Sequence, residues 1–254
     1  MNKKIEQLYE YRISKAEFEQ LEELDKVLVS VICFAASEIN MFSKLYLCSS
    51  PDFCDETLLD SLIASQKMTV LRSWSAKLFE LHEFAKQFQS QKGGSADARS
   101  AVRLFLSKFD GQDDRIGFNV ARALRNEVTN HYSLPAAKKN LKHVSDRANL
   151  VLLLHCKDGN SSYPMGEEVL FAGRVNRFAS GKNDGQNGHK LLEKWYQFNL
   201  DATKLARELL NDVIASLIFA KYPEKFARQK TFFVDDEFSQ EHGAVCVPLF
   251  LRST

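Results

Sequence analysis

The segment Ser14–Cys48, SKAEFEQLEELDKVLVSVICFAASEINMFSKLYLC, decides the fold. Its apolar side chains recur at steps of three and four residues, which is the spacing of one face of an α-helix. The residues of this face are Phe18, Leu21, Leu24, Leu28, Val31, Ile32, Ala35, Ile39, Phe42 and Leu45. The pattern predicts one long helix with a buried face, and Pro51 breaks the chain after it.

Helical spacing returns along much of the remaining chain. It predicts a second long helix from Asp55 or Glu56 to beyond Gln87, antiparallel to the first, and then a glycine loop at Gln91–Ser95. Further helices are predicted over about Ala96–Phe109, from Asp113 or Asp114 to a point before Pro135, over about Ala136–Arg147, and from His189 to about Ala220. We therefore expect a mainly α fold with a helical core at about 14–147 and 189–220.

Two segments do not follow this helical spacing. An aliphatic run, Asn149–Cys156, and the later Glu167–Gly173 predict a small β-hairpin over about 149–175, with a helix continuing through Leu154 as the alternative. The C-terminal tail, 223–254, contains an acidic patch at Asp235–Glu237 and an apolar run, Ala244–Leu251, that is typical of a strand. No internal repeat is visible, so we expect 1–254 to form a single domain.

Composition restricts the function classes. The chain holds 34 Lys and Arg against 33 Asp and Glu, so its net charge is close to zero. A surface that binds nucleic acid would therefore need a local excess of positive charge. The five cysteines are scattered without a CxxC pair, which indicates neither a zinc site nor a disulfide framework. We see no apolar run close to the roughly 20 residues that span a bilayer, and no signal core near the N-terminus. We expect a cytoplasmic protein without membrane contact, metal or cofactor.

The most basic stretch runs from Asp114 to Arg147. It holds seven Lys or Arg residues against three acidic ones. A solvated helix face is the simplest explanation of such a run, and an RNA-binding surface is the other. The residues that we expect to contact RNA are Arg122, Lys138, Lys139, Lys142 and the aromatic Tyr132, although packing would also explain Tyr132.

Within this stretch lies the sequence ALRNEVTNHY, residues 123–132. It contains Arg125 followed by Asn126, and then His131 with five residues between the Arg and the His. This arrangement resembles the motif of the HEPN superfamily, in which an Arg and a polar residue precede a His by four to six residues. The resemblance extends to the order of helices, so it implies a HEPN-like helical bundle.

The resemblance also implies an activity. Members of this family include metal-independent endoribonucleases that act as homodimers, with the two motifs facing each other in one composite cleft. Many are toxins or anti-phage effectors. Arg125, Asn126 and His131 would then be catalytic, RNA the substrate, and an antitoxin or other regulatory protein a partner.

These residue types suit the chemistry of RNA cleavage. An imidazole such as that of His131 has an unperturbed pKa of about 6.5, which lets it accept and donate protons near neutral pH. The guanidinium of Arg125 donates two parallel hydrogen bonds to a phosphate and stays charged. On a regular helix, however, Arg125 and His131 are about 120° and about 9 Å apart. Either the helix ends before His131, or the site is completed by a second chain.

The motif residues are also compatible with purely structural roles. Arg125 could pair with an acid on the surface, and His131 could cap a helix or pair with Glu127. A catalytically inactive binding or assembly module of the HEPN type, and a purely structural helical dimer, are the competing functions.

Overall fold

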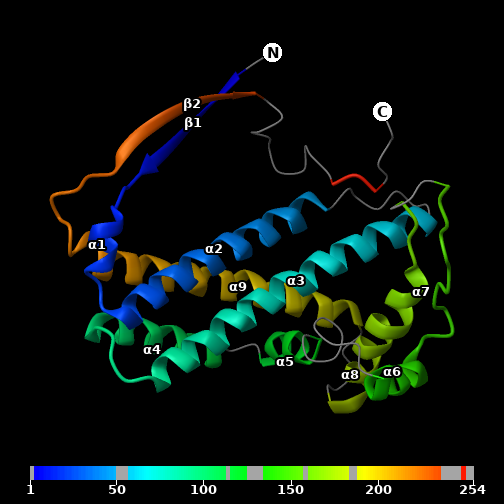
Figure 1. Cartoon of the computed structure of the whole chain (residues 1–254). Helices are drawn as coiled ribbons and strands as arrows, with labels where there is room; N and C mark the ends of the chain where they lie inside the picture. The colour runs from blue at the N-terminus through cyan, green and yellow to red at the C-terminus, as the bar shows by residue number, and fades with distance from the viewer. Residues whose placement is uncertain are drawn as a thin grey trace. The chain divides into compact units, whose positions relative to one another are not determined.

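The computed structural model describes residues 3–49, 57–112, 115–124, 134–156, 160–182, 188–235 and 247–249, and these residues are mainly helical (Figure 1). The fold class expected from the sequence, mainly α, is confirmed. In chain order the elements are β1 (Lys3–Glu10), α1 (Lys15–Glu19), α2 (Glu23–Cys48), α3 (Thr57–Ser90), α4 (Ala96–Asp110), α5 (Arg115–Leu124), α6 (Leu134–Asn140), η2 (Leu141–His143), α7 (Pro164–Gly166), η3 (Glu167–Ala172), α8 (Gly173–Lys182), α9 (Gly188–Ile214), η4 (Ala215–Phe219) and β2 (Arg228–Asp235).

The first predicted helix is interrupted. A capping box between Ser14 and Glu17 starts the short α1, and α2 begins only at Glu23. Contacts from a distant segment hold α1 apart from α2, because the Tyr222 hydroxyl donates to the Glu17 carbonyl at 2.6 Å and the Lys221 ammonium donates to the Gln20 carbonyl at 2.7 Å. Apolar periodicity alone could not reveal this break.

Helices α3, α4 and α9 lie where periodicity placed them. The loop between α3 and α4 is also confirmed, with positive φ angles at Gly93 and Gly94. The carboxylate of Asp25, near the start of α2, accepts hydrogen bonds from the Ser95 backbone N–H, just before α4. The start of α2 thus lies beside the end of α3, as expected for two antiparallel helices.

The predicted β-hairpin is wrong. Between Asn149 and Cys156 the described residues form only an isolated bridge, from Leu153 to Ser162. The segment expected as the second strand is helical, as η3 and the start of α8. Pro164 starts this helix, and Phe171 buries its ring against Trp195. The helix expected over Ala136–Arg147 is shorter than predicted, since α6 and η2 end at His143.

An antiparallel pair of strands was not predicted. β1 pairs with β2 in a register from Lys3↔Asp235 to Glu10↔Arg228. The charged sequence of β1 carries little strand signal, and its partner is far away along the chain. The strand expected over Ala244–Leu251 is absent from 247–249, and the rest of that run lies outside the described residues. In the acidic patch, Asp235 is the last residue of β2, and residues 236–237 lie outside the described residues.

The chain divides into two compact units. Unit 1 consists of Met1–Glu38, Glu80–Gly111 and Lys204–Val245, and it buries a core that includes Leu28, Ile32, Phe88, Val102, Phe105, Phe109 and Val213. Unit 2 consists of Ile39–Phe79, Gln112–Thr203 and Cys246–Thr254, with a core that includes Leu71, Trp74, Phe79, Val120, Trp195 and Phe198. The expectation of a single domain stays a prediction.

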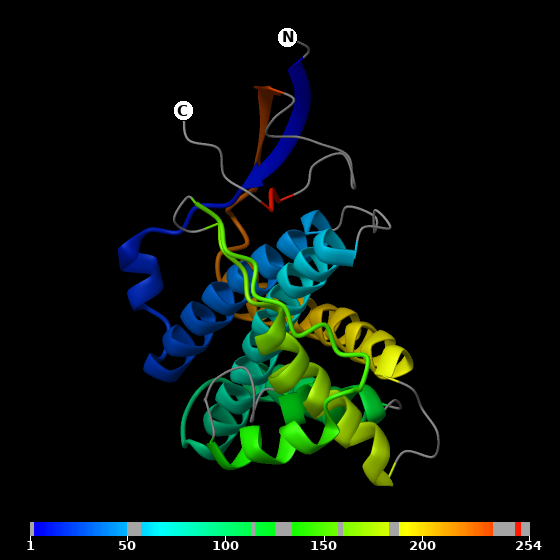
Figure 2. The same ribbon diagram turned by 90° about the vertical axis from the view of Figure 1, so that its right-hand side faces the viewer.

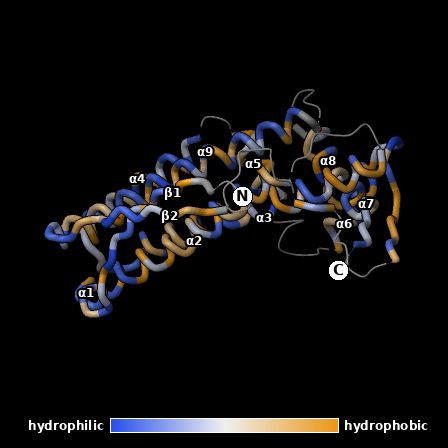
Figure 3. The backbone as a smooth tube through the Cα atoms, turned by 90° about the horizontal axis from the view of Figure 1, so that it is seen from above, coloured by the Kyte–Doolittle hydropathy of each residue, from blue (hydrophilic) through white to orange (hydrophobic). Residues whose placement is uncertain are grey.

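Helix α2 differs from what composition suggested. By length and hydropathy it could cross a membrane, contrary to the expectation that no apolar run comes close. The core helix of a soluble protein passes the same test, and here a third of the apolar window is buried. Figure 3 shows hydrophobic residues recurring along α2 between hydrophilic ones.

Candidate functional site

The motif lies in a segment of unit 2 between α5 and α6. Arg125, Asn126, His131 and Tyr132 lie outside the described residues, so their geometry stays a prediction. The helices on both sides are described, however. α5 ends at Leu124 and α6 begins at Leu134, and both contact α8. Figure 2 shows α6 beside α8. The two ends of the motif segment are thus held within one unit.

A close helix contact positions α5. A Cβ atom on Gly117 would lie 2.3 Å from the backbone oxygen of Lys194, so only glycine allows α5 to approach α9 this closely. The neighbouring Phe118 places its ring 5.5 Å from that of Phe79 and 5.8 Å from that of Phe198, between centroids. Helix α5 is therefore fixed by backbone proximity and aromatic packing together.

Backbone and amide contacts hold α6 and η2. The Asn140 side chain, which is buried, donates to the Leu170 carbonyl of η3 at 3.0 Å, and the Asn176 side chain of α8 donates to the His143 carbonyl at 3.1 Å. A Cβ on Gly173 would meet the Asn140 backbone oxygen at 2.8 Å, so α8 also packs tightly on the end of α6.

Four of the residues expected to bind RNA are described, and all four are exposed. They are Arg122 on α5, Lys138 and Lys139 on α6, and Lys142 in η2. Within the described part of the chain, no hydrogen bond or ion pair engages their side chains. Cations that are not neutralised by protein carboxylates can bind phosphate. The arrangement thus supplies positive charge on both sides of the motif segment.

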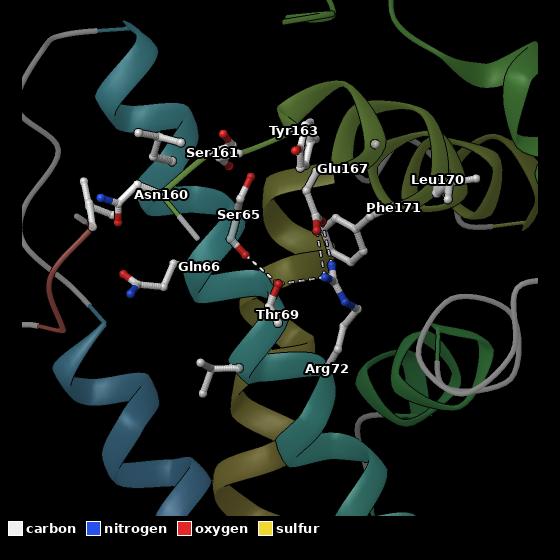
Figure 4. A pocket seen from close by; sticks show the side chains of 15 residues that line it. Ser65, Gln66, Thr69, Arg72, Asn160, Ser161, Tyr163, Glu167, Leu170 and Phe171 are labelled. Carbon is white, nitrogen blue, oxygen red and sulfur yellow. Dashed lines mark hydrogen bonds and ion pairs between the residues drawn. The ribbon is translucent and has the colours of Figure 1, made fainter. Parts of the chain in front are cut away.

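A cavity of about 570 Å³ also lies in unit 2, and sequence reasoning missed it (Figure 4). One wall is the first half of α3, with Ser65, Gln66 and Thr69, and the other is the segment from Asn160 through η3. The size is that of a small-molecule site. Because its walls are nearly 100 residues apart in sequence, no local pattern marked it.

An ion pair joins the two walls of the cavity. The guanidinium of Arg72 donates to both carboxylate oxygens of Glu167, at 2.6 and 2.7 Å, and Figure 4 shows the two side chains pointing toward each other. Arg72 also donates to the Thr69 hydroxyl at 3.0 Å and stacks 5.2 Å from the ring centroid of Phe171. The lining charges therefore neutralise each other, and the cavity suits an uncharged polar ligand.

Hydrogen bonds connect described residues on both sides of the segment that leads into the cavity wall. Leu153 and Ser162 exchange two backbone hydrogen bonds of 2.8 Å, and the Asn149 side chain donates to the Ser61 hydroxyl of α3 at 2.8 Å.

η3 is a π-helix, a geometry that occurs frequently at functional sites. On the α3 wall, the buried Oε1 atom of Gln66 has no hydrogen-bond partner among the described residues.

No group of three or more His, Cys, Asp or Glu side chains that could hold a metal ion occurs in the described ranges. In comparisons with family models, with curated proteins and with solved structures, the chain matches none.

Proposed function

We propose that this chain is a metal-independent endoribonuclease of the HEPN type, with Arg125, Asn126 and His131 as catalytic residues and with two copies completing each site. The observation that carries the proposal is the exposed positive charge on both sides of the motif segment. Arg122 lies on the helix before it and Lys138 on the helix after it, and both helices contact α8.

The proposed reaction uses the RNA's own 2′-hydroxyl as nucleophile. One His131 takes the proton from this hydroxyl, and the 2′-oxygen attacks the adjacent phosphorus. Arg125 stabilises the negative charge on the phosphorane, and Asn126 orients the phosphate or the imidazole. The 5′-oxygen leaves with a proton from the second copy's His131. The products are a 2′,3′-cyclic phosphate and a 5′-hydroxyl end.

The cations beside the motif would bind the RNA backbone. Arg122, Lys138, Lys139 and Lys142 contact phosphates in this proposal, which positions the strand without reading its sequence. Tyr132 would stack on a base. The further proposal of a cytoplasmic toxin or anti-phage effector, restrained by an antitoxin or other regulatory protein, rests on the family resemblance alone.

The decisive experiment incubates purified protein with a mixed RNA pool in EDTA. We expect cleavage products with cyclic phosphate ends, and a loss of rate of at least about 100-fold in Arg125→Ala and in His131→Ala. The exposed Arg103 and His155 supply matched controls, Arg103→Ala and His155→Ala, which should cleave at the parental rate. Cleavage that survives both motif substitutions, or no cleavage at all, would refute the proposal.

A second candidate function is a catalytically inactive module that binds a nucleotide or nucleoside, and the cavity beside η3 favours it. Its polar amides and hydroxyls and its self-neutralised charges suit a nucleoside better than a free phosphate. Calorimetric titration with adenosine and with AMP, in parental protein and in Gln66→Leu, distinguishes this function from the first.

A further inference from the structure

The exposed face of α2 is uncharged over several helical turns. Between the exposed Glu23 and the exposed Lys44, every exposed side chain of this continuous helix is uncharged: Val27, Ser30, Cys33, Phe34, Ser37, Asn40 and Met41. Phe34 is 67% exposed and Met41 57%. The opposite face is already buried through residues such as Leu28 and Ile32. A helix face that contacts only water normally carries charges, so this face has the composition of a contact surface.

The side chains of this face follow a seven-residue repeat. Val27, Phe34 and Met41 are spaced by seven, and so are Ser30, Ser37 and Lys44, three residues further on. This spacing is that of the a and d positions of a two-stranded coiled coil, here with apolar side chains in the first row and polar ones in the second. The two serine hydroxyls donate to backbone carbonyls of their own helix, at 2.8 Å from Ser30 to Lys26 and 3.0 Å from Ser37 to Cys33. Both serines can therefore pack against a neighbour without leaving a donor unpaired.

Size and charge along the repeat are complementary to an antiparallel copy of the same face. In an antiparallel pair, a positions lie opposite d positions of the partner helix. Phe34 then faces Ser37 of the other copy, and Met41 faces Ser30, so that each large side chain meets a small one. Val27 faces Lys44, whose ammonium lies within one turn of Glu23 on the other copy.

A parallel pair would be unfavourable. It would place Glu23 beside Glu23 and Lys44 beside Lys44, with like charges at both ends. We propose that α2 is a self-association surface, on which a second copy of this chain docks through its own α2 in antiparallel orientation. An α2 pair would supply a second copy of the proposed ribonuclease, but α2 can pair whether or not the chain cleaves RNA.

Oligomeric state, measured without RNA, tests the proposal. Light scattering after gel filtration should give twice the chain mass of 29.0 kDa at micromolar concentration. Phe34→Glu should raise the dimer Kd by at least about tenfold, because it places two unpaired carboxylates in the contact. Phe226, which is 82% exposed outside α2, supplies the matched control Phe226→Glu, which should stay dimeric. Circular dichroism checks that each variant is folded.

One further measurement tests the orientation, and a second tests whether α2 lies in the contact. Glu23→Lys and Lys44→Glu should each weaken the dimer, and the double variant should restore it, because only an antiparallel pair joins these positions. Because Cys156 is also exposed, the crosslinking is done in Cys156→Ser protein. A bismaleimide crosslinker should join two copies of it through the exposed Cys33, and adding Cys33→Ser should abolish the product.

Three outcomes would overturn the proposal. One is a protein that stays monomeric at every concentration. A monomer that sediments with phosphatidylcholine and phosphatidylglycerol vesicles counts as the same outcome. Another is a dimer that survives Phe34→Glu, which would leave the ribonuclease proposal intact and move its interface elsewhere. The third is a dimer that the paired charge exchange fails to restore.

Discussion

Arg72 and Glu167 form a two-pronged ion pair between α3 and η3, although 95 residues separate them in sequence. Their side chains are 12% and 27% exposed, so the pair is mostly shielded from water. Both residues line the cavity of unit 2, and Glu167 lies in a helix where the sequence suggested a strand. The contact therefore links the two walls of the cavity across a long separation in sequence.

Removing one partner of this pair should destabilise the protein. We expect Glu167→Gln to lower the free energy of unfolding by about 2 kcal/mol, because the largely buried Arg72 guanidinium loses its charged acceptor. Glu208→Gln is the control, since the Lys108–Glu208 pair has a similar distance, 2.7 Å, but side chains 45% and 53% exposed. That change should cost less than about 1 kcal/mol. Equal losses in urea titrations would contradict the role assigned to burial.

The close contact between α5 and α9 can be tested at Gly117. Gly117→Ala places a Cβ atom 2.3 Å from the Lys194 oxygen, so α5 must shift, at a cost of about 1–3 kcal/mol. Since α5 leads into the motif, cleavage of RNA should fall as well. Gly166→Ala is the control, because nothing lies within 4 Å of its added Cβ, and it should be neutral or slightly stabilising. The melting temperatures of both variants are compared by thermal unfolding. If Gly117→Ala is as stable as the parental protein, α5 accommodates the added Cβ atom at little cost in free energy, contrary to this prediction.

Local sequence patterns were sufficient to predict the long helices. The apolar spacing in α3, α4 and α9 depends only on residues three and four apart, which the sequence displays directly. The break between α1 and α2 depends instead on Tyr222, about 200 residues downstream. β1 depends on β2 near the other end of the chain in the same way. Such elements are set by tertiary contacts, which periodicity cannot register.

The residues of the candidate site could be predicted from the sequence only in part. The basic stretch identified Arg122, Lys138, Lys139 and Lys142, and the structure shows all of them exposed. The roles of Arg125 and His131 stay predictions, because these residues lie outside the described ranges. The cavity beside η3 could not be predicted. Its polar lining comes from two segments distant in sequence, one predicted as a helix and the other as part of a β-hairpin, and no local pattern indicated that they meet.

Stability should depend on pH through Glu17. Hydrogen bonds from Lys225 and from Ser14 lower the pKa of this carboxyl from 4.5 to about 2. Because the folded-state pKa is the lower one, the stabilisation is present above about pH 4.5 and is lost as pH falls toward 2. Lys225→Met should therefore lower the Tm at pH 7, and the difference from the parental protein should shrink between pH 4.5 and 2. A difference that is independent of pH in this window would exclude Glu17 as the titrating group.

The cations on α6 should control the salt dependence of RNA binding. On a 2′-O-methyl RNA, which cannot be cleaved by the proposed route, the double variant Lys138→Ala/Lys139→Ala should bind more weakly at low salt. The slope of log K against log salt should become shallower by about 1.4, since each phosphate contact with a single strand contributes about 0.7. Lys15 and Lys92, also exposed, supply the control double variant Lys15→Ala/Lys92→Ala, which removes the same charge from unit 1. If both double variants change the slope equally, binding follows net charge and α6 has no specific part in it.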